Sequence, residues 1–177
     1  MRQRGLGDGV DACALGATGR ESPAELAANP AVRDRVEALR LAAGTLMGLG
    51  DVSDRNYPKM TLISPPRHGG TVAARSFIPR VVHESIGVLA AVTAATACVL
   101  PGTVAHAMAG PSATDEAEAT LSIEHPSGAF DVRLGWEPGD PTRITRSALV
   151  RTARALMAGD LYVPLGVWNP SMKETNR

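Results

Sequence analysis

The longest stretch without a charged side chain is the feature that most constrains the fold of this chain. From Ser85 to Ala105 the sequence contains no Asp, Glu, Lys or Arg and is rich in Ala and Thr. A helix that is apolar on all sides is either embedded in a membrane or surrounded by its own protein. Since the hydrophobicity is mild and Pro101-Gly102 shortens the stretch, we expect a helix over about 84–100 that is surrounded by its own domain.

A short polar segment, His83-Glu84-Ser85, directly precedes this stretch and is followed by Gly87. The first backbone N–H groups of a helix have no partner within the helix and carry partial positive charge, which suits a carboxylate or phosphate. Two interpretations stay open. One is a ligand site at the start of the helix, where Gly87 permits close approach; the other is a capped buried helix in which His83 bonds to a neighbour.

Composition and charge exclude several classes of protein. A chain of 177 residues suffices for one domain with a core, and a formal net charge of zero indicates no nucleic-acid or membrane partner. Two cysteines far apart, Cys13 and Cys98, fit a reducing cytoplasm better than a disulfide scaffold. The four histidines lack metal-ligand spacing, and Gly and Asp interrupt any signal peptide at the N-terminus, so we expect a cytoplasmic protein without a metal site.

The remaining pattern predicts an α+β domain. Ser22, Pro23 and Glu25 have the spacing of an N-cap, a first helical residue and a capping box, and a second helix follows over about 31–48. Alternation predicts strands over 59–64, 71–78, 120–125 and 129–136 and from 143 onward, where the end of the segment to 164 is either a strand or a frayed helix. We expect a curved antiparallel sheet wrapped around one central apolar helix.

Further motifs are weaker. The segment "PPRHGG" lacks the Lys-Ser/Thr ending of a P-loop, so we expect a hairpin turn. His125, in the strand-turn segment "EHPSG", is a candidate acid or base because its pKa lies near neutrality. Arg151 and Arg154 either bind a carboxylate or are solvated, and Glu124 could pair with either of them. Cys98 is expected to be inert in the core.

Three segments taken in order, "DVSDRNYPKMTLISPPRHGGTVAARSFIPRVVHESIGVLAAVTAATACVLPGTVA", "EHPSGAFDV" and "LVRTARALMAGDLYVP", resemble the C-terminal half of the 4-oxalomesaconate tautomerases, which are PrpF-type isomerases. The resemblance runs from about Ala14 to Pro164. It implies a diaminopimelate epimerase-like fold, in which two similar domains, each a curved sheet around a central helix, face one another across the active site. It also implies an isomerase of aromatic compound degradation that moves a proton on a small di- or tricarboxylate without a metal or an organic cofactor.

The resemblance also implies which residues contact the substrate. Arg75 is expected to pair with a carboxylate, and His83 is expected to donate or shuttle a proton. Ser85, Ile86 and Gly87 are expected to offer backbone N–H groups. The further candidates are Glu84, Lys59, Arg67, His125 and Ser127.

Two departures from the family pattern bear on activity. The family's Gly-Gly-Thr-Ser-Lys loop and Asn-Cys-Gly-Asn helix start, expected to supply the catalytic lysine and cysteine, are absent from this chain. We therefore assign no catalytic residue within it. Arg80 and Val82 stand where these tautomerases have a His-x-Cys motif, and Glu84 places an anion where they have a small residue.

We expect an irregular segment over 1–20, a C-terminal diaminopimelate epimerase-like domain over 21–164 and a tail over 165–177. The expected partners are a small polycarboxylate and either a separate N-terminal half or a second copy of the chain. The alternative is a non-enzymatic truncated remnant, or a binding half-domain that needs a separate N-terminal half.

Overall fold

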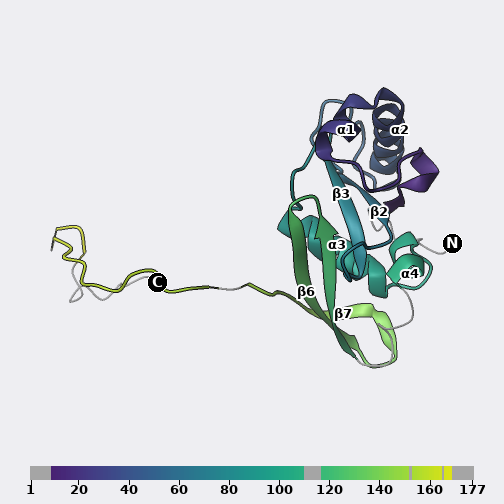
Figure 1. Ribbon diagram of the computed structural model, residues 1–177. Coiled ribbons are helices and arrows are strands. Elements are labelled where there is room, and N and C mark those ends of the chain that lie inside the picture. Colours follow the sequence, from purple (N-terminus) through teal and green to yellow (C-terminus); the bar gives the residue numbers. More distant parts are fainter. Residues whose placement is uncertain (1–8, 110–116, 152, 165, 169–177) are drawn as a thin grey trace.

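A computed structural model of the chain describes residues 9–109, 117–151, 153–164 and 166–168. These residues form an α+β structure around one curled sheet (Figure 1). The strands are β1 (Gly9–Asp11), β2 (Met60–Ser64), β3 (Val72–Ile78), β4 (Val81–Val82), β5 (Glu118–His125), β6 (Gly128–Glu137) and β7 (Asp140–Leu149). The helices are the 3-10 helix η1 (Cys13–Leu15) and the α-helices α1 (Pro23–Ala28), α2 (Pro30–Leu46), α3 (Val88–Val99) and α4 (Val104–Ala109).

The sheet is mixed. Its strand order is β1-β2-β3-β5-β6-β7, and β4 pairs separately with β3. The β2–β3 hairpin and the consecutive strands β5, β6 and β7 are antiparallel, as the alternating sequence pattern predicts. The pairs β1–β2 and β3–β5 are parallel, so the prediction of an antiparallel sheet is wrong at these two places. A parallel pair joins segments far apart in sequence, and no local turn signals it.

The β2–β3 hairpin forms a layer with packing on both faces, because successive side chains of a strand point to opposite sides. Ile63, Val72 and Ala74 belong to a hydrophobic cluster with α3. Leu62 and Phe77 belong to a second cluster with residues of α1 and α2. All five residues of β2 are consequently buried.

Helix α3 begins four residues later than the sequence predicts. It starts at Val88 rather than Glu84, and Gly87 is its N-cap, without a side-chain hydrogen bond. The reason is local, because the polar segment forms a turn of its own in which the Ser85 N–H donates to His83 Nδ1 at 3.0 Å.

The body of α3 contributes to one of the two hydrophobic clusters, together with strands of the sheet. From Ala91 onward its side chains are largely buried against the sheet, whereas Leu89 in its first turn is 81% exposed. The expected enclosure therefore does not reach the start of the helix. In the part of the chain that the structure describes, no helix is long and apolar enough to cross a membrane.

The first two helices follow their sequence signals. The Ser22 hydroxyl accepts the Glu25 N–H at 3.2 Å, and the Glu25 carboxylate accepts the Ser22 N–H at 2.8 Å, which confirms the capping box. Asn29 caps α2 by accepting the Val32 N–H at 3.2 Å.

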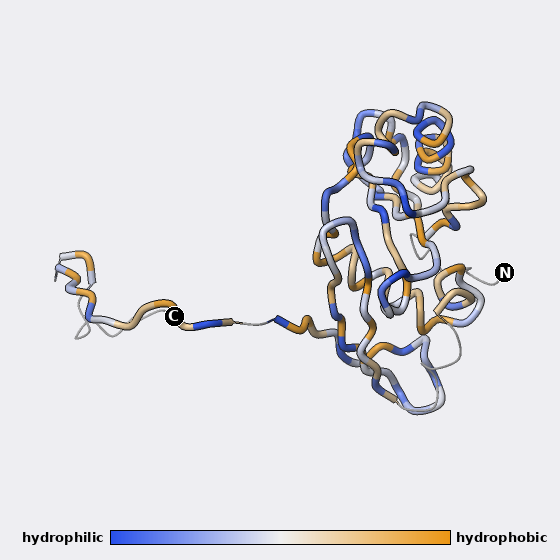
Figure 2. The backbone as a smooth tube through the Cα atoms, viewed as in Figure 1, coloured by the Kyte–Doolittle hydropathy of each residue, from blue (hydrophilic) through white to orange (hydrophobic). Residues whose placement is uncertain are grey.

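The two ends of the described chain differ from expectation in different ways. Residues 9–20, expected to be irregular, contribute β1 and η1. Residues 153–164 form neither helix nor strand and extend away from the rest of the structure (Figure 1). Parts of this extension are coloured as hydrophobic in Figure 2, and Leu156, Met157, Leu161 and Tyr162 are 83–91% exposed. Most of the polar segment 111–119 and of the tail 165–177 lies outside the described residues.

Candidate functional site

Two strand ends meet on one edge of β3 and bring His83 next to His125. Phe77 pairs with both β2 and β4, and Ala73 pairs with both β2 and β5, so β4 and β5 share the edge of β3 opposite β2. These two strands run in opposite directions and end facing one another. The His83 N–H donates to the Ser76 carbonyl at 2.8 Å, and His125 is the last residue of β5. The sheet topology therefore joins two residues that lie about forty positions apart.

A serine follows each of these histidines two residues later. The backbone N–H of that serine donates a hydrogen bond to the histidine ring. The distance is 3.0 Å from the Ser85 nitrogen to His83 Nδ1 and 3.3 Å from the Ser127 nitrogen to His125 Nδ1. The Ser127 hydroxyl also lies 3.2 Å from His125 Nδ1. Because Nδ1 accepts, each neutral ring carries its proton on Nε2, which is then the donor.

Positive charge gathers at this point. Burial and then the charges of Arg75 and His83 lower the pKa of His125 from its ordinary value. Arg75 is 9% exposed, and burial lowers the pKa of its guanidinium, which remains charged at neutral pH. Its Nε and Nη1 donate to the carbonyls of Glu21 and Ala74 at 2.9 and 3.0 Å, while Nη2 has no hydrogen-bond partner among the described residues. The carboxylates of Glu21 and Glu124 also act on Arg75 and offset part of the fall in its pKa. The charges that act on His125 itself are positive, which favours an anionic ligand beside this ring.

The turn between β2 and β3 is closed by a carboxylate of the protein itself. Glu124 accepts the backbone N–H groups of Arg67, His68 and Gly70 at 2.7, 2.7 and 2.9 Å. Burial acts to raise the pKa of Glu124, but these N–H groups and the charge of His68 outweigh it, and the pKa lies below its ordinary value. The predicted hairpin turn is confirmed, and Glu124 occupies the N–H groups that a phosphate would need.

The arginines after β7 do not join this arrangement. Arg151 stacks over the Phe130 ring at 4.2 Å, and both Arg151 and Arg154 are exposed. The hypothesis that Glu124 pairs with either of them is wrong, because its carboxylate is engaged by the turn.

The other candidate residues are not gathered in one place, because Lys59 and Arg67 lie beyond opposite ends of β2. His83, Gly87 and Lys59 line a cavity of about 650 Å³, whereas His125 lines a separate one of about 360 Å³. Ile86 is 5% exposed, so its side chain belongs to the core. The exposed candidates are Lys59, Arg67, Glu84, Gly87 and Ser127.

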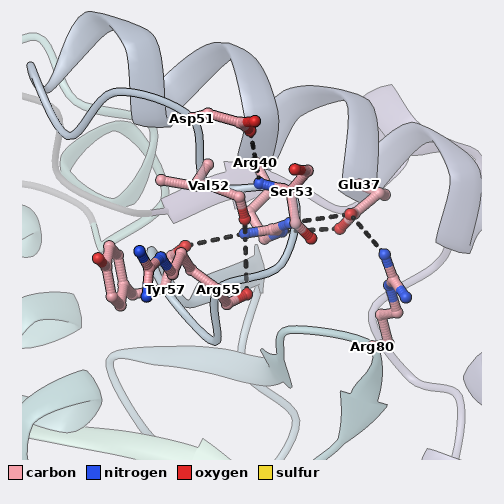
Figure 3. A network of polar contacts seen from close by, with 8 residues as sticks. All are labelled: Glu37, Arg40, Asp51, Val52, Ser53, Arg55, Tyr57 and Arg80. Atoms are coloured by element: carbon pink, nitrogen blue, oxygen red, sulfur yellow. Dashed lines mark hydrogen bonds and ion pairs between the residues drawn. The ribbon is translucent and has the colours of Figure 1, made fainter.

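A buried guanidinium that sequence reasoning missed organises the loop before β2. Arg40, on α2, has no exposed surface. Its Nε and Nη2 donate to the two carboxylate oxygens of Glu37 at 2.7 and 2.9 Å (Figure 3). It also donates to four loop carbonyls, those of Val52, Ser53, Arg55 and Tyr57, at 2.8 to 3.4 Å. No local pattern signals this cluster, because the carbonyls lie 12 to 17 residues from Arg40.

The same cluster reaches toward the histidine segment. Glu37 lies 3.5 Å from Arg80, in the turn between β3 and β4 (Figure 3). One network therefore connects the loop that leads to Lys59 with the turn that leads to His83.

The described part of the chain contains no metal-binding cluster, and the environment of its buried thiol differs from that of a reactive cysteine. No three His, Cys, Asp or Glu side chains gather there in a way that could hold a metal ion. Cys98 is buried, and burial raises the pKa of its thiol to about 12, so it packs as a protonated core residue, as predicted.

Comparison with known proteins gives a consistent result. The family described as PrpF protein matches residues 9–164. Over 154 residues the chain is 47% identical to a (4E)-oxalomesaconate Δ-isomerase from Novosphingobium sp. (strain KA1) and 49% identical to a 4-oxalomesaconate tautomerase from Pseudomonas putida. These matches cover 87% of this chain but only 42% and 41% of the two relatives. The chain therefore spans less than half the length of the curated relatives it matches.

A solved structure shows the same fold. The crystal structure of a methylitaconate-delta-isomerase matches with a TM-score of 0.69 at 21% sequence identity. The match covers 89% of this chain and 44% of that chain.

Proposed function

Because this chain belongs to the PrpF family, as its motifs predicted, we propose that its residues form one side of the active site of an isomerase that moves a proton along a small di- or tricarboxylate. Two relatives are named for oxalomesaconate, which makes 4-oxalomesaconate the first substrate to test. The observation that carries the proposal is the convergence of His83, His125 and the charge of Arg75 beside the segment that leads into α3.

In this proposal the substrate's carboxylates meet fixed donors. The Ala91 N–H already bonds to the Gly87 carbonyl, so the N–H groups of residues 88–90 have no partner within α3 and can face an anion. Ser85 offers its hydroxyl, because its N–H is held by His83. Arg75 adds positive charge that acts on His125, from a side chain bonded to the Glu21 carbonyl ahead of α1.

Proton transfer next to a carbonyl builds negative charge on the oxygen. Preorganised donors stabilise that charge more than they stabilise the neutral ground state. The Nε2–H groups of His83 and His125 are proposed to donate to this oxygen or to a neighbouring carboxylate. We assign no catalytic base to the residues of this chain, and Glu84, which is exposed, is proposed to point away from the bound anion.

The proposal extends to the architecture. The curled sheet with α3 would be one half of a diaminopimelate epimerase-like fold, and a facing half would supply the catalytic lysine and cysteine. That half would be a separate polypeptide. A second copy of the chain lacks the same motifs, so it could pair with this half without supplying these residues. The reaction would need neither a metal nor an organic cofactor. Support comes from the family match and from the methylitaconate-delta-isomerase structure, of which this chain covers 44%.

Turnover of 4-oxalomesaconate tests the proposal. The chain would be assayed alone, and together with the part of the Pseudomonas putida relative that it does not match, by following the enol absorbance. We expect turnover only in the mixture, at a rate above that of the added part alone. Association of the two parts without turnover would favour a binding half-domain. Turnover by the chain alone would contradict the assignment of no catalytic base.

A further inference from the structure

The cavity of about 650 Å³ lies between the first half of α3 and strands β1 to β3. Its volume falls within the range of small-molecule sites, and its apolar lining with few polar groups is typical of them. Among the residues that the structure describes, the lining includes no Asp or Glu. Its large apolar residues are Met47, Leu49, Ile63, Ile78, Val88 and Leu89.

A pair of hydroxyl groups interrupts this apolar lining. Thr61 and Ser76 are partners across β2 and β3, and their oxygens lie 3.2 Å apart. Both residues are nearly buried, at 5% and 3% exposure, yet both line the cavity. The two residues have one hydroxyl hydrogen each. One of these hydrogens forms the hydrogen bond between Thr61 and Ser76, so the other can donate to a ligand oxygen.

A cation precedes this pair in the sequence. Lys59 lies two positions before Thr61, directly ahead of β2. Lys59 lines the same cavity, and its ammonium group makes no ion pair among the residues that the structure describes. His83 lines the cavity as well and adds a further hydrogen-bonding side chain to the lining.

We propose that this cavity binds a carboxylic acid that carries an apolar group of several carbon atoms. The carboxylate lies against the Thr61–Ser76 hydroxyl pair and the Lys59 ammonium. The apolar group lies between α3 and the side chains of Leu49 and Ile78. This inference goes beyond the proposed function, because it assigns the cavity to a ligand other than the polycarboxylate substrate.

The test uses the full chain and four probes: acetate, butyrate, hexanoate and hexanol. Dissociation constants would be measured from NMR shifts of backbone amides. Each pair of added methylene groups is expected to tighten carboxylate binding by roughly tenfold. Hexanol, which has the same chain but no charge, is expected to bind at least tenfold more weakly than hexanoate. The largest shifts should fall on the residues that line the cavity.

Variants test the polar contacts. Thr61→Val with Ser76→Ala, and separately Lys59→Met, should each weaken hexanoate binding by roughly tenfold. Thr145→Val, the same substitution on the exposed face of β7, should leave it unchanged. Lys59 is exposed, so its variant is expected to fold even if the buried double variant does not. Affinity that is independent of chain length, or hexanoate binding that Lys59→Met leaves intact, would overturn the proposal.

These binding data separate the two proposals. Chain-length-dependent hexanoate binding in a protein that never isomerises 4-oxalomesaconate would leave the cavity assignment standing and remove the proposed function. Isomerisation of 4-oxalomesaconate by a protein that does not bind hexanoate would leave the proposed function standing and remove the cavity assignment.

Discussion

His83 and His125 converge at one edge of β3, and each ring accepts through Nδ1 the backbone N–H of the serine two residues further along. Neither residue is informative alone, because a single histidine in a turn is usually satisfied by a neighbour. Taken together they indicate an anion-binding site, because both rings make the same hydrogen bond and positive charges act on His125.

The mutual influence of these residues can be measured without any activity. Burial, and after it the charges of Arg75 and His83, keep the pKa of His125 below its ordinary value. His83→Gln removes one of these causes and should therefore raise the pKa of His125, as followed by NMR titration of the imidazole protons. His68→Gln removes an exposed imidazole that is not among these causes and should leave it unchanged. An unchanged pKa in His83→Gln would show that the two rings are not neighbours.

The Glu124 carboxylate should contribute to stability in a pH-dependent way. Glu124→Gln replaces an acceptor of three N–H groups by an amide and should lower the free energy of unfolding by about 1–3 kcal/mol. Since the folded-state pKa lies below its ordinary value, this contribution is present above the ordinary value and is lost as the pH falls through it toward the folded-state pKa. Urea unfolding at pH 7 and pH 4 would measure both effects.

A matched control is Glu137→Gln. Glu137 pairs with Arg143 at 2.8 Å on the surface, so its loss should change stability by less than about 1 kcal/mol. An equal loss of stability from Glu124→Gln and Glu137→Gln would show that the hydrogen bonds of Glu124 to the β2–β3 turn do not stabilise the fold.

Arg40 should be among the most sensitive positions of the chain. Arg40→Met removes a fully buried cation that binds Glu37 and four carbonyls, and leaves those acceptors unpaired. The expected loss in the free energy of unfolding is about 3–5 kcal/mol, measured by chemical denaturation. Arg33→Met, on the exposed side of the same helix, should cost less than about 1 kcal/mol. A mild effect of Arg40→Met would mean that the loop before β2 is held by other contacts.

The exposed apolar side chains predict association. Leu89 on α3 and the extended segment with Leu156, Met157, Leu161 and Tyr162 are 81–91% exposed. Exposed apolar surface beyond scattered single residues marks an interaction site. We expect light scattering to show a mass that rises with protein concentration, and replacement of Leu156 and Leu161 by Ser to reduce that rise. A constant monomer mass at high concentration would count against the proposed partner half or second copy.

Local signals in the sequence predicted local structure well. The capping box of Ser22 and Glu25, the β2–β3 hairpin and the burial of Cys98 are all confirmed, since each depends on residues close in sequence or on apolar content. The start of α3 was predicted four residues too early. The segment His83 to Ser85 has the composition of a cap, but its hydrogen bond is made within the segment itself.

Long-range contacts were not predictable from this one sequence. The parallel pairs of β1 with β2 and β3 with β5 leave no periodic trace that identifies a partner. Glu124 and the turn residues that donate to it lie more than 50 positions apart in the sequence. The same holds for Arg75 and the Glu21 carbonyl. For the same reason the sequence offered His83 and His125 as separate candidates, and only the shared edge of β3 joins them.

The most direct test of the candidate site is an NMR titration of His125 in the presence and absence of saturating 4-oxalomesaconate. A bound polycarboxylate places negative charge beside this ring, so the pKa of His125 should rise by about one unit or more, and Arg75→Gln should weaken the binding. An unchanged pKa of His125 under saturating ligand, with shifts only in other parts of the chain, would contradict the account.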